Sequence, residues 1–121
     1  MNIVKVVWMC IVAAGAASQT AAWAHAGLEL AVPAKDAQLG SAPADITLKF
    51  NEKLESGFSG IKVLDAAGQE VGVKKAIVDS ADAAVLHAPL PVLKPGVYTV
   101  KWVAVGADGH RRAGDYRFTV K

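Results

Sequence analysis

Apolar and polar residues alternate in short runs along residues 28–121. A period of two is typical of strands that bury one face and expose the other, and it argues against helices. Seven runs are present, and their apolar positions in chain order are Leu28, Leu30 and Val32; Ile46, Leu48 and Phe50; Ile61 and Val63; Val71, Val73 and Ile77; Leu86, Ala88 and Leu90; Tyr98, Val100, Trp102 and Ala104; and Tyr116, Phe118 and Val120. The pattern therefore predicts an all-β chain of seven strands.

The spacing of the turn signals predicts how these strands are arranged. Turns that recur about every 8–12 residues are typical of an antiparallel two-sheet sandwich or small barrel of the immunoglobulin-like kind. The longest run, Val97–Val105, follows the turn signal Pro95-Gly96 and is predicted to be a central strand. Residues 35–44 are predicted to be the one long early loop. The chain leaves no room for a second domain.

The first 24 residues follow a different pattern. A lone charge, Lys5, precedes an apolar run, and the segment ends in small residues at Ala22-Trp23-Ala24. This pattern predicts a secretory signal peptide over residues 1–24. The apolar run is shorter than the roughly 20 residues that a spanning helix requires. We therefore expect cleavage after Ala24, a periplasmic domain over residues 25–121, and no membrane insertion afterwards.

The charge and the sulfur content of the chain exclude several classes of function. The chain has 13 Lys and Arg against 11 Asp and Glu, so removing Lys5 leaves 12 against 11. A nearly neutral domain is a poor partner for nucleic acid. The only cysteine, Cys10, and both methionines, Met1 and Met9, lie in the predicted leader, so no disulfide or sulfur ligand is available beyond it. The usual catalytic motifs are absent, and we expect no enzymatic activity.

Two of the three histidines have the chemistry of metal ligands. Cleavage after Ala24 would make His25 the first residue, and its free amine and ring Nδ1 could then chelate one ion. Asp108-Gly109-His110 places a carboxylate and an imidazole two residues apart, with a glycine that lets the backbone bend between them. Nitrogen and oxygen donors without sulfur favour a tetragonal copper(II) site.

Simpler interpretations remain for parts of this set. Asp-Gly is a common turn, so Asp108-Gly109 could be structural. His87 lies between Leu86 and Ala88 and is predicted to point outward as a surface residue, outside the site. The strand aromatics fall on inward positions, which favours core packing over a ligand platform; they are Phe50, Tyr98, Trp102, Tyr116 and Phe118.

These residues together carry a family resemblance. The sequence resembles the CopC copper-resistance family in His25 after a signal sequence, in Phe50-Asn51-Glu52, in the Pro-Gly-x-Tyr-x-Val-x-Trp pattern within residues 93–102, and in Asp108-Gly109-His110 followed by Phe118-Thr119-Val120. The resemblance covers residues 25–121. It implies a seven-stranded Greek-key, cupredoxin-like barrel that binds copper(II) through His25, Asp108 and His110.

The resemblance also assigns a role to Glu52 and marks two departures. Some members carry a glutamate beside the site, where Glu52 would accept a hydrogen bond from a ligand ring or copper-bound water; an exposed strand-end carboxylate without a role is the alternative. Members with a copper(I) site carry a methionine-rich loop, but residues 65–72 contain no methionine. Arg111 replaces the proline that commonly follows the loop histidine. The resemblance thus implies the copper(II)-only type.

The expected function is that of a monomeric periplasmic copper(II) carrier. It would sequester copper for resistance or homeostasis and pass it to a partner such as an inner-membrane transporter of the CopD type. One alternative is a metal-free immunoglobulin-like interaction module, which the fold alone would allow. The other is a copper monooxygenase with an N-terminal histidine chelate, which is disfavoured because Asp108 would occupy the position that oxygen needs.

Overall fold

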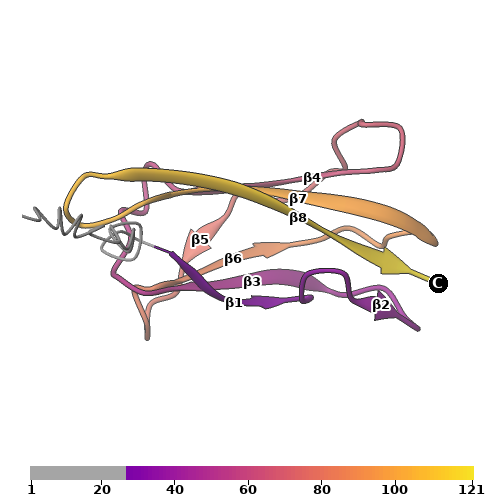
Figure 1. Cartoon of the computed structure of the whole chain (residues 1–121), viewed down its shortest axis with the longest axis horizontal. Helices are drawn as coiled ribbons and strands as arrows, with labels where there is room; N and C mark the ends of the chain where they lie inside the picture. Colours follow the sequence, from indigo (N-terminus) through magenta and orange to yellow (C-terminus); the bar gives the residue numbers. More distant parts are fainter. Residues whose placement is uncertain (1–26) are drawn as a thin grey trace, which may run out of the picture.

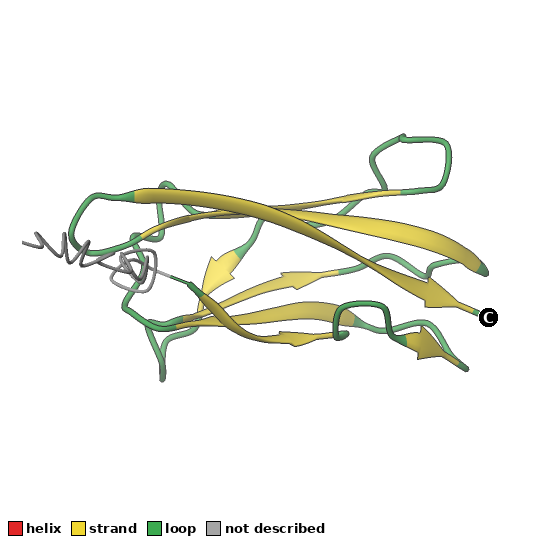
Figure 2. Cartoon of the chain, in the orientation of Figure 1, coloured by secondary structure: helices red, strands yellow, loops and turns green. Residues whose placement is uncertain are grey.

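Residues 27–121 are described by a computed structural model and form two β-sheets that pack face to face (Figure 1). No helix occurs among them (Figure 2), and so none is available that could cross a membrane. The strands are β1 (Leu28–Val32), β2 (Gln38–Leu39), β3 (Asp45–Phe50), β4 (Gly60–Leu64), β5 (Ile77–Val78), β6 (Val85–Pro89), β7 (Gly96–Val105) and β8 (Arg111–Val120). The prediction of an all-β sandwich is confirmed.

Each sheet contains four strands. One has the order β1-β3-β6-β5 and the other β2-β8-β7-β4. All neighbouring pairs are antiparallel except β2 and β8, which run parallel. The central element of the second sheet is the long hairpin of β7 and β8, which pair from Gly96↔Val120 to Val105↔Arg111. β2 lies within residues 35–44, which the sequence predicts to be a loop. The prediction missed this strand because two residues are too few to show an alternating pattern.

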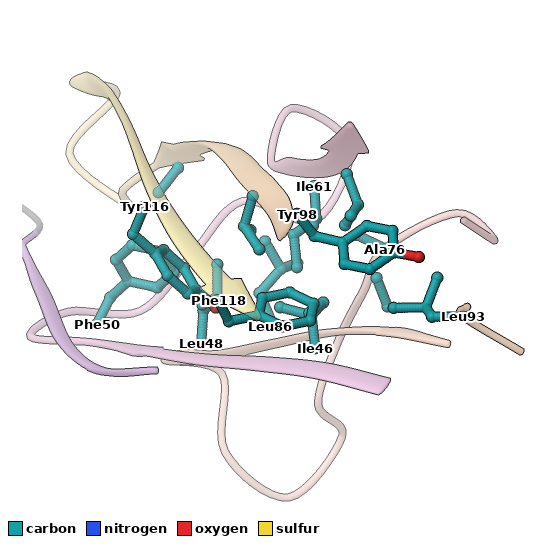
Figure 3. Packing of buried hydrophobic residues seen from close by; sticks show 14 of the residues in the cluster. Ile46, Leu48, Phe50, Ile61, Ala76, Leu86, Leu93, Tyr98, Tyr116 and Phe118 are labelled. Carbon is teal, nitrogen blue, oxygen red and sulfur yellow. The ribbon is translucent and has the colours of Figure 1, made fainter. Parts of the chain in front are cut away.

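The core lies between the inner faces of the two sheets. Ile46, Leu48 and Phe50 on β3 are at most 1% exposed, as their spacing predicts. They face the inward residues of β8, of which Tyr116 and Phe118 are the largest (Figure 3). Burial raises the pKa of the Tyr116 phenol above its ordinary value. The packing of aliphatic and aromatic side chains between sheets supplies the main stabilisation of such a domain.

The first strand departs from the predicted alternation. Leu30 and Val32 were expected inward beside Leu28, but they are 55% and 52% exposed. The register of β1 against β3 shifts between Leu28 and Leu30. An extra residue in one strand turns every later side chain to the other face, so these two positions lie outside.

The fourth predicted run is also only partly a strand. Val71 and Val73 lie outside the strands, and only Ile77 with Val78 pairs with β6. Ile77 is 61% exposed rather than inward. In contrast, the last strand is longer than its apolar residues indicated. β8 begins at Arg111, because pairing along the whole of β7 extends it beyond the alternating part.

One end of the sandwich brings together three chain segments. The start of β1, the end of β3 and the turn between β7 and β8 all lie there (Figure 1). The C-terminus lies at the opposite end, beside β2. The end with the β7–β8 turn contains the sequence motif Asp108-Gly109-His110.

Candidate metal site

The turn between β7 and β8 is built around Gly109. This glycine has a φ of +84°, which is a left-handed conformation that glycine adopts without steric cost. Its N–H donates to the carbonyl of Gly106 at 2.9 Å, and the N–H of Gly106 donates to the carbonyl of His110 at 3.0 Å. The chain therefore reverses tightly, and Asp108 and His110 come to the same side of the turn.

Asp108 and His110 are in direct contact. The ring Nδ1–H of His110 donates to Asp108 Oδ2 at 2.9 Å, and the backbone N–H of His110 donates to Asp108 Oδ1 at 3.0 Å. The hydrogen bond from the ring, followed by that from the backbone, lowers the pKa of the Asp108 carboxyl below its ordinary value. A proton on Nδ1 leaves the ring's lone pair on Nε2.

Glu52 lies against the same turn, just beyond the end of β3. A Cβ added at Gly106 would overlap the Glu52 carboxylate, and Asp108 Oδ1 is 3.1 Å from the same point. Glu52 therefore lies beside Asp108, and Gly106 provides the space.

The donor set fits a cation chemically. Glu52 Oε1 is buried and has no hydrogen-bond partner within residues 27–121. A buried carboxylate oxygen without a donor carries a large desolvation cost, which a bound cation or its water would offset. The neighbouring donors are one imidazole and a second carboxylate. Nitrogen and oxygen donors of this kind suit copper(II).

Backbone hydrogen bonds hold the β7–β8 turn to the segment that follows β3. Ala107 N–H donates to Lys53 O at 2.9 Å, and Glu55 N–H donates to Val105 O at 2.8 Å. A further bridge pairs Leu54 with Gly106. The two segments are thus fixed relative to each other, so the Glu52 and Asp108 carboxylates stay together.

His25 and the predicted signal peptide lie outside the described residues. The described chain begins at Gly27, which is hydrogen-bonded to Asn51 next to Glu52. Within residues 27–121 no group of three His, Cys, Asp or Glu is close enough to hold a metal ion. A complete site therefore requires a further donor.

His87 is separate from this site. It lies on β6, where its ring contacts Asp79 Oδ1 at 3.0 Å and Thr47 Oγ1 at 3.4 Å. Its side chain is 34% exposed. The prediction that His87 does not belong with Asp108 and His110 agrees with this placement. Its partner Asp79 could not be identified from the sequence, because the contact depends on how the Asp79 turn folds back against β6.

Two residues at the site were missed as contributors. Gly106 makes space for Glu52, and Asn51 contacts Gly27. Asn51 belongs to the Phe50-Asn51-Glu52 segment that carries the family resemblance. Nothing in its residue type or spacing indicated that it would contact Gly27. A glycine such as Gly106 gives no signal for a close contact between segments that are distant in sequence.

Known proteins with similar sequences include some that are named for copper resistance. A family model described as the CopC domain matches residues 28–121. Protein YobA of Escherichia coli K12 is 44% identical over 100 residues, covering 82% of this chain and 81% of YobA. Copper resistance protein C of Pseudomonas syringae pv. tomato is 36% identical over 120 residues, covering 94% of each chain.

A solved structure has the same fold. CopC from Methylosinus trichosporium OB3b matches with a TM-score of 0.76 and 31% sequence identity, covering 80% of this chain and 94% of that one. The matched part includes most of the sandwich, so sequence and structure identify the same set of relatives.

Proposed function

Because this chain belongs to the CopC family, we propose that it is a periplasmic copper(II)-binding protein that sequesters or carries the ion and delivers it to a partner. The family match and the relative named copper resistance protein C support copper binding in copper resistance. Copper is the cargo in this proposal, and the protein catalyses no reaction.

The observation that carries the proposal is the contact between Asp108 and His110 in the β7–β8 turn, with Glu52 lying against the same turn. Copper(II) favours four roughly coplanar donors, with nitrogen and oxygen preferred. We propose that the amine and ring of His25, the ring of His110 and the carboxylate of Asp108 supply them. Glu52 would orient a ligand ring or a copper-bound water by accepting a hydrogen bond.

The lack of sulfur specifies the oxidation state in this proposal. Residues 27–121 contain neither cysteine nor methionine, and these soft ligands are the ones that select copper(I). The stretch that is methionine-rich in members with a copper(I) site is here a polar loop, closed by the N–H of Asp65 donating to the carbonyl of Gln69 at 2.8 Å. Residues 27–121 therefore offer ligands that suit copper(II) and lack the sulfur ligands that suit copper(I).

Exposure of the ligands supports a role in delivery. The side chains of Asp108 and His110 are 43% and 62% exposed. A partner can approach such ligands and replace them one at a time, as transfer requires. We propose that a membrane copper transporter of the CopD type receives the ion from a monomer. A copper monooxygenase is disfavoured, because Asp108 would close the coordination position where oxygen reacts.

The test is copper(II) binding by the processed protein. The full chain is expressed for export, purified from the periplasm through a C-terminal tag, and weighed by mass spectrometry to establish its first residue. We expect a protein that begins at His25 and gives one tight, nitrogen-rich tetragonal signal in electron paramagnetic resonance. Asp108→Ala and His110→Ala should each weaken binding at least tenfold, whereas His87→Ala should not.

A second variant tests the chelate directly. An alanine inserted between Ala24 and His25 moves the free amine away from the ring, so copper(II) affinity should fall at least tenfold, or by about 1.4 kcal/mol. If the processed protein binds no copper(II), or binds it equally well with Asp108 and His110 replaced, the proposal is wrong. In the first case, a metal-free interaction module would be the leading account; in the second, copper(II) would bind elsewhere than at Asp108 and His110.

A further inference from the structure

The side chain of Asn51 continues the hydrogen bonding between β1 and β3 at the end of the sandwich where the candidate site lies. The last backbone pair there is Leu28↔Phe50. Beyond it, Gly27 N–H donates to Asn51 Oδ1 at 2.7 Å, and Asn51 N–H donates to Gly27 O at 3.0 Å. The side-chain amide thus takes the place of the backbone carbonyl that the ladder would otherwise supply.

These two hydrogen bonds fix a part of the chain that the strand pairing holds only weakly. The β1–β3 register shifts between Leu28 and Leu30, and such a bulge disrupts the ladder locally. Gly27 lies immediately before this irregular part. Because both its N–H and its carbonyl are bonded to Asn51, the backbone at Gly27 has one orientation rather than several.

Asn51 is also joined directly to the other half of the site. The next residue, Glu52, places its carboxylate against Gly106 and beside Asp108. One dipeptide therefore connects the segment that leads back to residue 25 with the turn that carries Asp108 and His110. Movement of Asn51 would change the separation of these two parts.

From this arrangement we propose that Asn51 is a positioning residue of the copper site: its side chain holds Gly27, two residues after the proposed ligand His25, at the end of the sandwich that carries Asp108 and His110. The proposal rests on the copper(II) function proposed above. A chelate made by an amine and its own ring requires the backbone to arrive in one orientation, and holding it there before binding avoids an entropic cost on binding. Asn51 would raise affinity without touching copper.

The experiment uses the processed protein, with copper(II) as the probe. Asn51→Ala should lower copper(II) affinity about fivefold, the size expected for one lost hydrogen bond, and should add a second resonance signal with fewer nitrogen donors. Asn51→Asp keeps an acceptor oxygen at the same distance and should retain the native signal. Asn51→Gln displaces the acceptor by one methylene and should lower copper(II) affinity as Asn51→Ala does. If the alanine variant does not fold, the Asp and Gln variants decide the question.

A double-mutant cycle separates positioning from a general structural role. In a His25→Ala background, Asn51→Ala should cause no further loss of affinity, because the residue that it positions is gone. Asp45→Ala, an exposed change at the opposite end of β3, is the control and should leave affinity unchanged in both backgrounds.

The outcomes are distinct from those that test the function. If unmodified protein binds copper(II) tightly and Asn51→Ala binds it equally well, or loses the same affinity with and without His25, the positioning role is wrong and the copper function stands. Failure of the unmodified protein to bind copper(II) would instead reject the function itself.

Discussion

Gly106 is the residue on which the position of Glu52 depends. A Cβ at this position would overlap the Glu52 carboxylate, which is the far end of a flexible side chain and can rotate away. We therefore expect Gly106→Ala to change the free energy of unfolding by less than about 1 kcal/mol, because little of the core is affected. Copper(II) affinity should fall about tenfold, as is typical when a group that orients metal ligands is displaced.

The measurements for Gly106→Ala are chelator competition for copper(II) and urea unfolding of the metal-free protein. Gly57→Ala is the matched control, because a Cβ there would have no atom within 4 Å. If Gly106→Ala and Gly57→Ala bind copper(II) equally, Glu52 has no role in binding and is a strand-end carboxylate only.

Asp79, which directly follows β5, gives a prediction about the pH dependence of stability. The hydrogen bond with His87 is the main cause that lowers the pKa of Asp79 below its ordinary value of 3.8. A lowered pKa means that this carboxylate stabilises the fold above pH 3.8 and that its contribution is lost as the pH falls through the lower, folded-state pKa. His87→Ala should therefore raise the pKa of Asp79 and make stability less steeply pH-dependent below about pH 4.

Carboxyl-carbon NMR titration of Asp79 and urea unfolding between pH 2 and pH 6, roughly the range over which carboxyl groups titrate, would measure both effects. Thr47→Ala is the control, since it removes the 3.4 Å contact on the other ring nitrogen and leaves the Asp79 contact in place. A pKa of Asp79 that is the same in both variants would contradict the proposed cause.

At the scale of elements, the β7–β8 hairpin depends on a close contact between Trp102 and Gly114. The two residues are paired across the hairpin, and a Cβ at Gly114 would lie 2.5 Å from Trp102 Cζ2. The indole also contacts the Phe50 ring edge-on, with ring centroids 5.1 Å apart at 65°. We expect Gly114→Ala to destabilise the fold by about 1–3 kcal/mol, because a rigid ring must move.

Urea unfolding followed by circular dichroism would measure this loss. Gly40→Ala is the control, because its Cβ would lie in open space and it shares the effect of alanine on the unfolded chain. The difference between the two variants isolates the steric term. An equal stability of both would show that the Trp102 indole can relax away from β8 without cost.

The elements that could be predicted from the sequence are those with one buried and one exposed face over their whole length. β3 alternates without interruption, so its core residues Ile46, Leu48 and Phe50 were identified correctly. β1 alternates too, but its bulge reverses the faces of Leu30 and Val32. A bulge is decided by the partner strand, so no pattern within β1 could show it.

In the candidate site too, contacts between residues close in sequence could be predicted, whereas contacts between distant segments could not. Asp108 and His110 are two residues apart around a glycine, so their contact could be predicted locally. The placement of Glu52 near them came from the family resemblance. Its contact with Gly106 depends on how the β3–β4 segment pairs with the hairpin, which the sequence of neither segment specifies alone.

The end of the sandwich that carries the proposed metal site lies opposite the C-terminus. Gly27 and the β7–β8 turn lie at one end of the sandwich, and Lys121 lies at the other, where its N–H donates to Leu39 O at 2.8 Å (Figure 1). The two sheets enclose one cluster of buried hydrophobic residues (Figure 3). A ligand that joins segments at only one end still stabilises the whole domain, because a small β-domain unfolds as one cooperative unit.

Because the domain unfolds as one unit, its melting temperature reports metal binding. It can therefore test which oxidation state of copper the site prefers. At a free copper(II) concentration about 100 times the dissociation constant, binding to the folded state alone adds about 2.7 kcal/mol. For a domain of this size, the melting temperature should rise by about 10–20 °C, and a chelator should reverse the rise. Silver(I), a stable substitute for copper(I), prefers sulfur ligands, which residues 27–121 lack, so it should raise the melting temperature far less. Scanning calorimetry with each ion would compare them, and an equal rise with silver(I) would contradict a site selective for copper(II).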